Sequence, residues 1–478
     1  MKDVAIIGAG ICGAAVAYYL AEYSLDVCVI ERCDDVAKGT TRANSAIIHA
    51  GYDPESETLM AKSNVRGNIL AGEICERLGV DFKRIGSLVL AFSDDDLKTL
   101  ETLYERGVEN GVPDMKILSK EETLAKEPKL SGEVAGALYA PTAGIVNPWQ
   151  YCIAMSNFAY KNGVQFLFNS PVTRIEKIDG GYKITAGENT VEAKYIVSAA
   201  GVHCDEINRL VGLDEFNVRV VRGEYYLLDK SQGSLVSSVV FQCPSSVGKG
   251  VLVSPTVHGN LIVGPNAEEI SDKDDVATTL VGQDAVRALA VKTSPNVSFR
   301  DNIRNFAGNR CYIQSHDFVV EESKTAKGFI NMAGIKSPGL SSAPALAERV
   351  VEILKACGLE LKKKNEIKEY KYPVLLRDLS GAEQAKRIAE NPRFARVICR
   401  CETITEGDIV TALGDGFTPA TISAVKRRCN AGMGRCQGGF CSMRVHEIIA
   451  NERGITPEEV TLDGGNSYIV TGDTKEVL

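Results

Sequence analysis

The sequence predicts an α/β protein with a discontinuous nucleotide-binding domain, an inserted α+β domain and a small helical domain towards its C-terminal end. Three observations lead to this prediction. A β-branched run at Val4–Ile7 precedes a glycine-rich turn and an alanine-rich helix. Short β-rich segments lie between later stretches that read as further strands and a helix of the same nucleotide-binding domain. Five of the 14 cysteines lie between residues 399 and 441.

Length and composition limit the possible classes of protein. A chain of 478 residues has room for about three domains of ~150 residues. Apolar residues make up 44% and charged residues 24%, as in ordinary globular proteins. The net charge of −8 argues against nucleic acid as a partner, because phosphate binding needs a basic face. The cysteines are too dilute for a disulfide scaffold, so we expect a reduced, cytoplasmic protein.

The uncharged stretch from Val4 to Ala21 resembles a membrane span by hydropathy alone. Its regularly spaced glycines have a better explanation, given below, and no other stretch is long and apolar enough. A signal peptide is also not expected, since Asp3 directly follows Lys2 and no small-residue cleavage site stands out. We expect no direct membrane span, and any docking on a membrane would go through a partner.

The run Gly8–Gly13 has the spacing G-x-G-x-x-G between a predicted strand and a predicted helix. Gly8 would make the tight turn, Gly10 would let a pyrophosphate approach the backbone, and Gly13 would let helix and strand pack closely. The helix N-terminus would bind the pyrophosphate. Glu31 ends the next strand, Val27–Glu31, where it can accept hydrogen bonds from a ribose diol. These features predict a Rossmann-like dinucleotide site.

Further strands and a helix complete the predicted architecture. The expected strands of the nucleotide-binding domain are Val164–Phe168, Ser170–Ile178, Tyr182–Ala186 and Tyr195–Ala199, and its last helix covers about Ala343–Ala356. The inserted β-rich segments are Gly223–Leu228, Gly250–Ser254 and Asn260–Gly264. We therefore assign the nucleotide-binding domain to 1–80, 141–215 and 315–358, the inserted domain to 81–140 and 216–314, a linker to 359–395, the cysteine-bearing domain to 396–453 and a tail to 454–478.

Four segments in order resemble the D-amino-acid-oxidase-like FAD-dependent family, and most closely its glycerol-3-phosphate dehydrogenase and L-2-hydroxyglutarate dehydrogenase branches. They are Gly39–Gly51, Gly144–Pro148, Ala199–Gly201 and Ala333–Leu340. The resemblance implies a noncovalent FAD that accepts hydride at N5. The helix after Leu340 can direct its dipole at negative charge near flavin N1–O2. The implied FAD contacts are Gly8, Gly10, Gly13, Glu31, Thr41, Arg42, Ser45, Val172, Gly201, Gly334, Ser337, Gly339 and Leu340.

The same resemblance suggests where an anionic substrate binds. Arg310, in Ala307–Arg310, matches a family arginine that binds the substrate anion, and a guanidinium grips a phosphate or carboxylate bidentately. Lys336 is the second candidate. Arg222 and Tyr225 lie in a segment that resembles one near the substrate. A surface or domain-bridging role remains open for Arg310 and Arg222.

Oxidation of a secondary alcohol also needs a base for the hydroxyl proton, and histidine suits this near neutral pH. His49, in the second flavin-contacting segment, is our first choice, with a purely structural role as the alternative. His258 reads more simply as part of a hairpin turn and His203 as a packing residue, and His316 is a minor alternative.

The cysteine-bearing segment has the pattern Cys399-x-Cys401 followed by Cys436-x-x-x-x-Cys441. Four thiolates are the ligand set of a 2Fe-2S cluster, whereas zinc pairs usually leave at least two residues between ligands. Zinc and an empty site remain as alternatives. The segment resembles the bacterioferritin-associated-ferredoxin-like domain fused to the large subunit of anaerobic glycerol-3-phosphate dehydrogenases. Cys429 falls outside that motif and is left without a ligand role.

These resemblances imply an FAD- and 2Fe-2S-dependent dehydrogenase that oxidises sn-glycerol 3-phosphate to dihydroxyacetone phosphate. The flavin takes two electrons and the cluster passes them on singly, to a second flavoprotein or iron–sulfur subunit rather than to oxygen. L-2-Hydroxyglutarate or another 2-hydroxy acid is the alternative substrate, and an amino or imino acid the third. A non-catalytic electron-relay subunit is the alternative of a different class.

Overall fold

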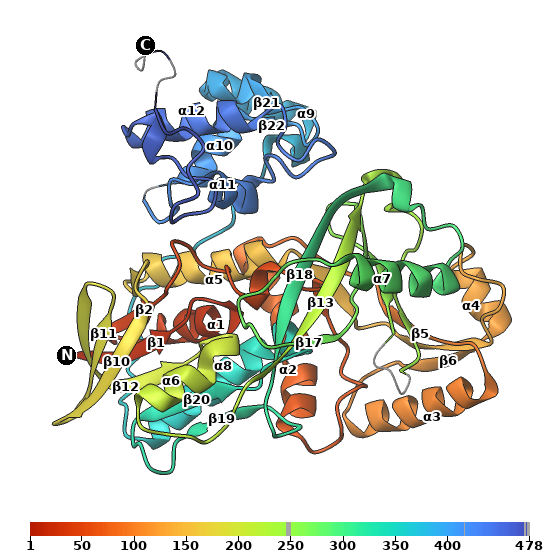
Figure 1. Cartoon of the computed structure of the whole chain (residues 1–478), viewed down its shortest axis with the longest axis horizontal. Coiled ribbons are helices and arrows are strands. Elements are labelled where there is room, and N and C mark those ends of the chain that lie inside the picture. The colour runs from red at the N-terminus through yellow and green to blue at the C-terminus, as the bar shows by residue number, and fades with distance from the viewer. Residues whose placement is uncertain (245–249, 415, 473–474, 476–478) are drawn as a thin grey trace. The chain divides into compact units, whose positions relative to one another are not determined.

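The computed structural model describes residues 1–244, 250–414, 416–472 and 475. The chain divides into two compact units, one formed by residues 1–32 and 36–370 and the other by residues 371–478 together with 33–35. Each unit is described by itself below, and the elements are labelled in Figure 1.

The first unit contains a mixed sheet with the strand order β10-β11-β12-β1-β2-β9, in which β20 joins β12 and β19 joins β20. β1 pairs in parallel with β12 on one side and β2 on the other. β12 is shared: its first half pairs with β11 and its second half with β20. The strands are β1 (Lys2–Ile7), β2 (Val27–Ile30), β9 (Gln165–Leu167), β10 (Val172–Ile178), β11 (Gly181–Ala186), β12 (Asn189–Ser198), β19 (Val319–Glu322) and β20 (Phe329–Ala333).

Helices pack against this sheet and against one another. β2 and the Val4–Ile7 part of β1 are apolar and buried, as strands covered on both faces must be. α1 packs on α5 and α8, and α8 packs on α2. The helices are α1 (Ile11–Leu20), α2 (Leu59–Leu78), α5 (Pro148–Lys161), α6 (Cys204–Leu210) and α8 (Gly339–Ala356). The stretch from Val4 to Ala21 is therefore strand, turn and helix. Within the described residues, no helix is long and apolar enough to cross a bilayer.

A second sheet of the first unit has the order β17-β13-β16-β15-β14-β5-β7-β6, with β18 paired to β13. The long strands β13 and β18 run antiparallel side by side in Figure 1, with Gly223 opposite Gly308 and Val221 opposite Arg310. Its strands are β5 (Ser87–Ala91), β6 (Lys116–Ser119), β7 (Gly136–Ala140), β13 (Arg219–Leu228), β14 (Val239–Gln242), β15 (Leu252–Pro255), β16 (Leu261–Gly264), β17 (Glu268–Ile270) and β18 (Asn302–Tyr312). The accompanying helices are α3 (Asp94–Glu109), α4 (Lys120–Lys126) and α7 (Leu280–Thr293).

The first unit also contains a small third sheet with the order β3-β8-β4. It consists of β3 (Ile47–Ile48), β4 (Phe82–Arg84) and β8 (Gly144–Val146). β3 lies at the end of the segment predicted to contact flavin, so its pairing with β8 holds that segment in place.

The second unit is mainly helical around its own core of buried apolar side chains and cysteines, including Ile404, Ile409, Val425 and Ile449. Its elements are β21 (Val397–Cys399), β22 (Ile404–Thr405), α9 (Gly381–Glu390), α10 (Glu406–Leu413), α11 (Ile422–Cys429) and α12 (Ser442–Arg453). Part of the expected linker belongs to this unit. Leu375 enters the core, and the Tyr372 hydroxyl donates to the Arg428 carbonyl at 2.9 Å. Packing of isolated apolar residues anchors a segment whose composition resembles a linker.

Candidate functional site

The glycine-rich turn connects β1 to α1 with backbone that only glycine adopts readily. Gly8 has φ of +103°, and a Cβ there would lie 2.6 Å from the Ala199 carbonyl oxygen. A Cβ on Gly13 would collide with the Gly8 carbonyl oxygen. The turn is thus packed directly on the end of β12, at the carboxyl edge of the parallel strands where ligands of such sheets bind.

The N-terminus of α1 has no acidic residue in its first turn and no side-chain bond from its own N-cap residue, Gly10. The amide groups and helix dipole at this end therefore have no capping carboxylate of their own. Beside the turn, a carboxylate oxygen of Glu31 accepts a hydrogen bond from the Ala9 N–H at 2.7 Å. These features fit a pyrophosphate at the helix and a ribose at Glu31.

The second predicted flavin segment packs on the start of α1. The Thr41 hydroxyl oxygen accepts a hydrogen bond from the Ile11 N–H at 2.9 Å. The Arg42 carbonyl accepts one from the Trp149 indole at 3.0 Å, a contact that no local sequence pattern predicts. Trp149 follows the Asn147–Pro148 start of α5, so the family-like run at Gly144–Pro148 positions this segment through an indole.

His49 is held by its backbone and faces the loop before α8. Its N–H donates to the Ser341 hydroxyl at 2.8 Å, and its carbonyl accepts from the Asn64 and Asn68 amides of α2. Its Nε2 lies 3.4 Å from the Ser337 hydroxyl, and its ring stacks on Phe241 with centroids 5.7 Å apart. The structure therefore brings together two predicted site residues that are 288 positions apart.

Strand β18 reaches the same segment from the inserted domain. Gly308 lies so close to the Ala43 carbonyl that a Cβ would collide with it. The Thr40 hydroxyl donates to the Asn309 carbonyl at 2.7 Å. On the neighbouring strand β13, the Tyr225 hydroxyl lies 3.1 Å from the Ser45 hydroxyl. Tyr225 is buried and stacks on Phe306, so only its hydroxyl end reaches the flavin segment.

Two cations lie at this end of β18. An Nη of Arg310 donates to the Asn266 carbonyl at 3.2 Å, and Arg310 forms no ion pair with any residue that the structure describes. The Lys336 ammonium lies over the Tyr312 ring, 4.3 Å from its centroid. Lys336 precedes Ser337, which contacts His49. Arg310, Lys336 and His49 are therefore linked through neighbouring residues into one region.

Arg222 is placed differently from the other candidates. It is buried, and its guanidinium pairs with Asp275 at 2.6 Å and Glu268 at 2.7 Å. The carboxylate of buried Glu224 lies 3.8 Å away and also accepts hydrogen bonds from Thr279. Because carboxylates surround its charge, Arg222 is suited to holding the inserted domain together and not to binding a substrate anion.

The remaining FAD candidates occupy two loops and a strand. Gly201 and Gly334 have φ of +59° and +68°. Gly334 directly follows the end of strand β20, and Gly201 lies shortly after the end of strand β12. Gly339 and Leu340 begin α8, which has no side-chain N-cap bond. Val172 begins β10, two residues after Ser170, whose N–H donates to the Glu31 carbonyl at 2.9 Å.

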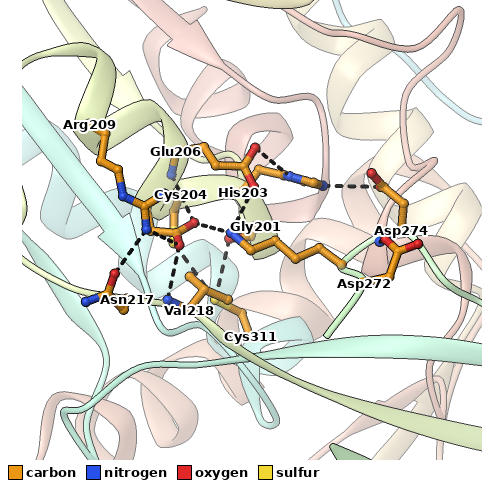
Figure 2. Close-up of polar contacts among 12 residues, drawn as sticks. Gly201, His203, Cys204, Glu206, Arg209, Asn217, Val218, Asp272, Asp274 and Cys311 are labelled. Atoms are coloured by element: carbon orange, nitrogen blue, oxygen red, sulfur yellow. Dashed lines mark hydrogen bonds and ion pairs between the residues drawn. The ribbon is translucent and has the colours of Figure 1, made fainter. Parts of the chain in front are cut away.

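A cluster of polar residues surrounds Gly201 and the start of α6, as Figure 2 shows. The Gly201 carbonyl accepts from the Cys311 thiol at 3.4 Å, and the Cys204 and Cys311 sulfurs are 3.9 Å apart, too far for a disulfide. His203 lies between the carboxylates of Glu206 at 3.0 Å and Asp274 at 3.2 Å. This arrangement gives His203 a structural role. His258 lies in the turn between β15 and β16, as predicted, and His316 is exposed.

The Lys273→Met variant tests how much this cluster contributes to stability. Lys273 donates to buried Asp205 at 2.5 Å and to Glu206 at 2.9 Å. Burial alone raises the pKa of Asp205, but hydrogen bonds from Lys273 and the Val218 N–H outweigh it and hold that pKa below its ordinary 3.8. We expect the variant to lose about 2 kcal/mol of unfolding free energy at pH 7, measured by urea denaturation.

The effect of Lys273→Met should depend on pH with a definite sign. Since the folded-state pKa of Asp205 is depressed, its interaction with Lys273 stabilises above the ordinary pKa and is lost as pH falls through the folded-state value. The difference from wild type should therefore shrink below about pH 4. Lys98→Met, which breaks the exposed pair with Asp95, should change stability little. Equal midpoints for wild type and Lys273→Met at pH 7 would contradict this role.

The four predicted cluster ligands form two sulfur pairs in the second unit. The Cys401 and Cys436 sulfurs are 3.5 Å apart, and a hydrogen bond joins Cys399 to Cys441. That bond, opposed by burial and aided by the Gly432 and Glu402 N–H groups, lowers the pKa of the Cys399 thiol to about 6. Cys429 is separate: it is buried, donates to the Val425 carbonyl, and burial raises its pKa to about 12.

The donor set suits a two-iron cluster. Among the described residues, no group of three or more His, Cys, Asp or Glu is arranged around a single ion position. Two pairs of thiolates would provide two ligands for each of two irons, and backbone N–H groups already point at Cys399 and Cys436 sulfurs, as around iron–sulfur clusters. Cys399, Cys401, Cys436 and Cys441 would hold the cluster.

Comparisons with known proteins identify an FAD-dependent domain and a 2Fe-2S binding domain. A family described as FAD dependent oxidoreductase matches residues 3–353, and a BFD-like 2Fe-2S binding domain matches residues 397–451. A glycerol 3-phosphate dehydrogenase of Caloramator mitchellensis is 49% identical over 99% of both chains. The structure of an FAD-bound L-α-glycerophosphate oxidase from Mycoplasma pneumoniae has a TM-score of 0.75 at 33% identity, covering 78% of this chain and 99% of that one. Human L-2-hydroxyglutarate dehydrogenase is 34% identical over 55% of this chain and 60% of its own length.

Proposed function

Because this chain belongs to the FAD-dependent oxidoreductase family and has a C-terminal BFD-like 2Fe-2S binding domain, we propose that it oxidises sn-glycerol 3-phosphate to dihydroxyacetone phosphate. The family matches confirm the predicted α/β fold, the two cofactors and the class of enzyme. The observation that carries the choice of substrate is the 49% identity to a glycerol 3-phosphate dehydrogenase along 99% of both chains. The similarity to L-2-hydroxyglutarate dehydrogenase extends over only 55% of this chain.

The proposed substrate site lies between the flavin segment and the end of β18. Arg310 has one carbonyl partner and no ion pair within the described part of the chain, so its guanidinium can bind a phosphate. Lys336 supplies a second positive charge from the loop before α8. Tyr225 borders the site through its hydroxyl contact with Ser45. A pair of cations matches the two negative charges of a phosphate dianion better than it matches the single charge of one carboxylate.

His49 is proposed to take the hydroxyl proton. Its backbone is held by hydrogen bonds with Ser341, Asn64 and Asn68, and its ring stacks on Phe241. The Nε2 atom, which lies near the Ser337 hydroxyl, would accept the proton as the C–H bond breaks. Bound FAD supplies the hydride acceptor, and the protein orients the substrate and balances its charge.

Electrons are then proposed to leave through the 2Fe-2S cluster to a partner protein. A flavin accepts two electrons together, whereas an iron–sulfur cluster carries one, so the cluster suits a single-electron acceptor. The partner would be a redox subunit or carrier and not molecular oxygen.

Anaerobic titration of the FAD-loaded protein tests the substrate. We expect sn-glycerol 3-phosphate to bleach the visible flavin absorption band, with L-2-hydroxyglutarate and L-proline leaving it unchanged. sn-Glycerol 1-phosphate is the matched control because only its stereochemistry differs. Bleaching by L-2-hydroxyglutarate alone would replace the proposed substrate, and failure of every alcohol and amine would indicate a relay subunit.

A further inference from the structure

Exposed basic and apolar residues immediately flank the cluster ligands. Arg400 lies between Cys399 and Cys401, Arg435 precedes Cys436, and Phe440 precedes Cys441. With Met443 and Arg444 we call these residues the cluster rim. All five are exposed, and Phe440 is 90% exposed, more than any other large apolar side chain that the structure describes.

We propose that the cluster rim is the docking surface for a small acidic protein that carries one electron. This inference deepens the proposed electron exit and rests on it. The partner is defined by its chemistry: carboxylates around an apolar patch, with a one-electron redox group beneath.

The rim lies at the exposed edge of the ligand set. Cys401 is exposed and Cys436 partly so, whereas Cys399 and Cys441 are buried. Arg400 and Arg435 are the chain neighbours of the two accessible cysteines. The Phe440 N–H donates a hydrogen bond to the Cys436 sulfur. A partner that covers Phe440 would therefore lie directly over the accessible pair of ligands.

Phe440 lies in a turn that is held by local hydrogen bonds. The Gly439 N–H donates to the Cys436 carbonyl at 3.0 Å, and the Ser442 hydroxyl donates to the Gly438 carbonyl at 2.7 Å. Gly438 has φ of +91°, and a Cβ there would lie 2.5 Å from the Ser442 hydroxyl oxygen. The backbone on both sides of Phe440 is fixed, so the ring is presented to solvent at low entropic cost. Rigid aromatic anchors of this kind carry much of the binding energy at protein interfaces.

Charge decides the kind of partner. The chain carries a net charge of −8, yet the rim contains three arginines. Arg444 pairs with Glu447 at 2.6 Å, and Arg400 forms no ion pair with any residue in the described ranges. The nearby Glu402 is buried and paired with Arg377 at 2.7 Å. A local basic surface on an acidic protein steers an acidic partner to this point and away from the rest of the molecule.

An anionic membrane and a second copy of this chain are the other possible occupants. Membrane recognition typically uses clusters of four to eight basic residues, more than the three in the rim. Redox encounters between proteins use small interfaces, for which one aromatic residue and a few charges are sufficient. The rim therefore favours a protein carrier.

The test measures how tightly the full-length protein, loaded with both cofactors, binds a small acidic electron carrier. The probe is a purified acidic flavodoxin, and the basic haem protein cytochrome c is the opposite-charge control. We expect flavodoxin to bind with a Kd that rises with NaCl concentration, and cytochrome c not to bind at the rim. Phe440→Ala should weaken flavodoxin binding at least about tenfold, and the Arg400→Glu/Arg435→Glu double variant should abolish it at low salt.

Two matched variants control for exposure and charge. Leu280→Ala removes an apolar side chain that is 78% exposed on α7, and Lys386→Glu reverses an exposed charge on α9. Both should bind flavodoxin like wild type. Visible absorption of the 2Fe-2S cluster must be retained by the rim variants, so that loss of binding reports the surface and not the cluster.

The outcomes separate this inference from the proposed function. Unchanged flavodoxin binding by the rim variants overturns the docking surface. The proposal of a carrier docking surface is also overturned if Phe440→Ala disperses a homodimer, because the rim would then bind a second copy of this chain. It is likewise overturned if flavodoxin does not bind and the rim variants lose binding to phosphatidylserine vesicles. Failure of the proposed substrate would appear as absent flavin bleaching and would leave carrier binding intact.

Discussion

The Arg310→Leu variant should show a rise of about 100-fold in the apparent KM for sn-glycerol 3-phosphate, equivalent to about 3 kcal/mol. Leucine removes a guanidinium that has a single described partner, the Asn266 carbonyl. Loss of this charge leaves a phosphate dianion facing Lys336 alone. Steady-state kinetics with an artificial electron acceptor would measure the change. The kcat should fall less than KM rises, because the proposed role of Arg310 is to bind the phosphate, away from the reacting C–H bond.

The control for this variant is Arg304→Leu, which removes an exposed arginine from the opposite part of the same strand. Its KM should match that of wild type. A KM for Arg310→Leu within a factor of about two of wild type would remove Arg310 from the substrate site. Lys336 would then be the remaining cation of the proposed site.

The Cys436→Ala variant should lose the visible absorption of the 2Fe-2S cluster completely. Cys436 is one member of the accessible sulfur pair, with Cys401 at 3.5 Å, and alanine cannot replace a thiolate ligand. Iron and sulfide analysis and visible spectroscopy of the purified protein would measure the loss. Flavin reduction by the substrate should persist, because the FAD segments belong to the other unit.

Cys429→Ala is the matched control for this ligand set. Cys429 is buried in the same unit, but its thiol donates to the Val425 carbonyl and lies outside the predicted motif. The variant should keep its full content of iron and sulfide. Cluster loss in Cys429→Ala together with retention in Cys436→Ala would reverse the assignment.

Local patterns in the sequence predicted the dinucleotide turn well. Gly8 and Gly13 are read from spacing because their restrictions are local: a positive φ at one and a close helix–strand approach at the other. The predicted cluster ligands were also chosen from local patterns, since the four cysteines form two short motifs, and the assignment of these four stays a prediction. The meeting of His49 with Ser337 across 288 positions depended instead on the resemblance to a known family.

Contacts that result from closing the sheets could not be read from the sequence. Trp149 to Arg42, Thr40 to Asn309 and Gly308 to Ala43 each join segments that lie far apart in the chain. Arg222 illustrates the same limit. Its sequence neighbourhood indicated a substrate role, but its surroundings are set by Glu268 and Asp275, which strand pairing brings alongside it.

The way β12 is shared between β1, β11 and β20 has a consequence for synthesis on the ribosome. β1 finds its β12 neighbour only after nearly 200 residues have been made, and β20 completes the sheet about 130 residues later. At 5–20 residues per second, the nascent chain waits roughly 15 to 70 s before its nucleotide-binding sheet can close. During the later part of this interval the second half of β12 has no partner on its β20 side, so this edge of the sheet stays open while the inserted domain is made.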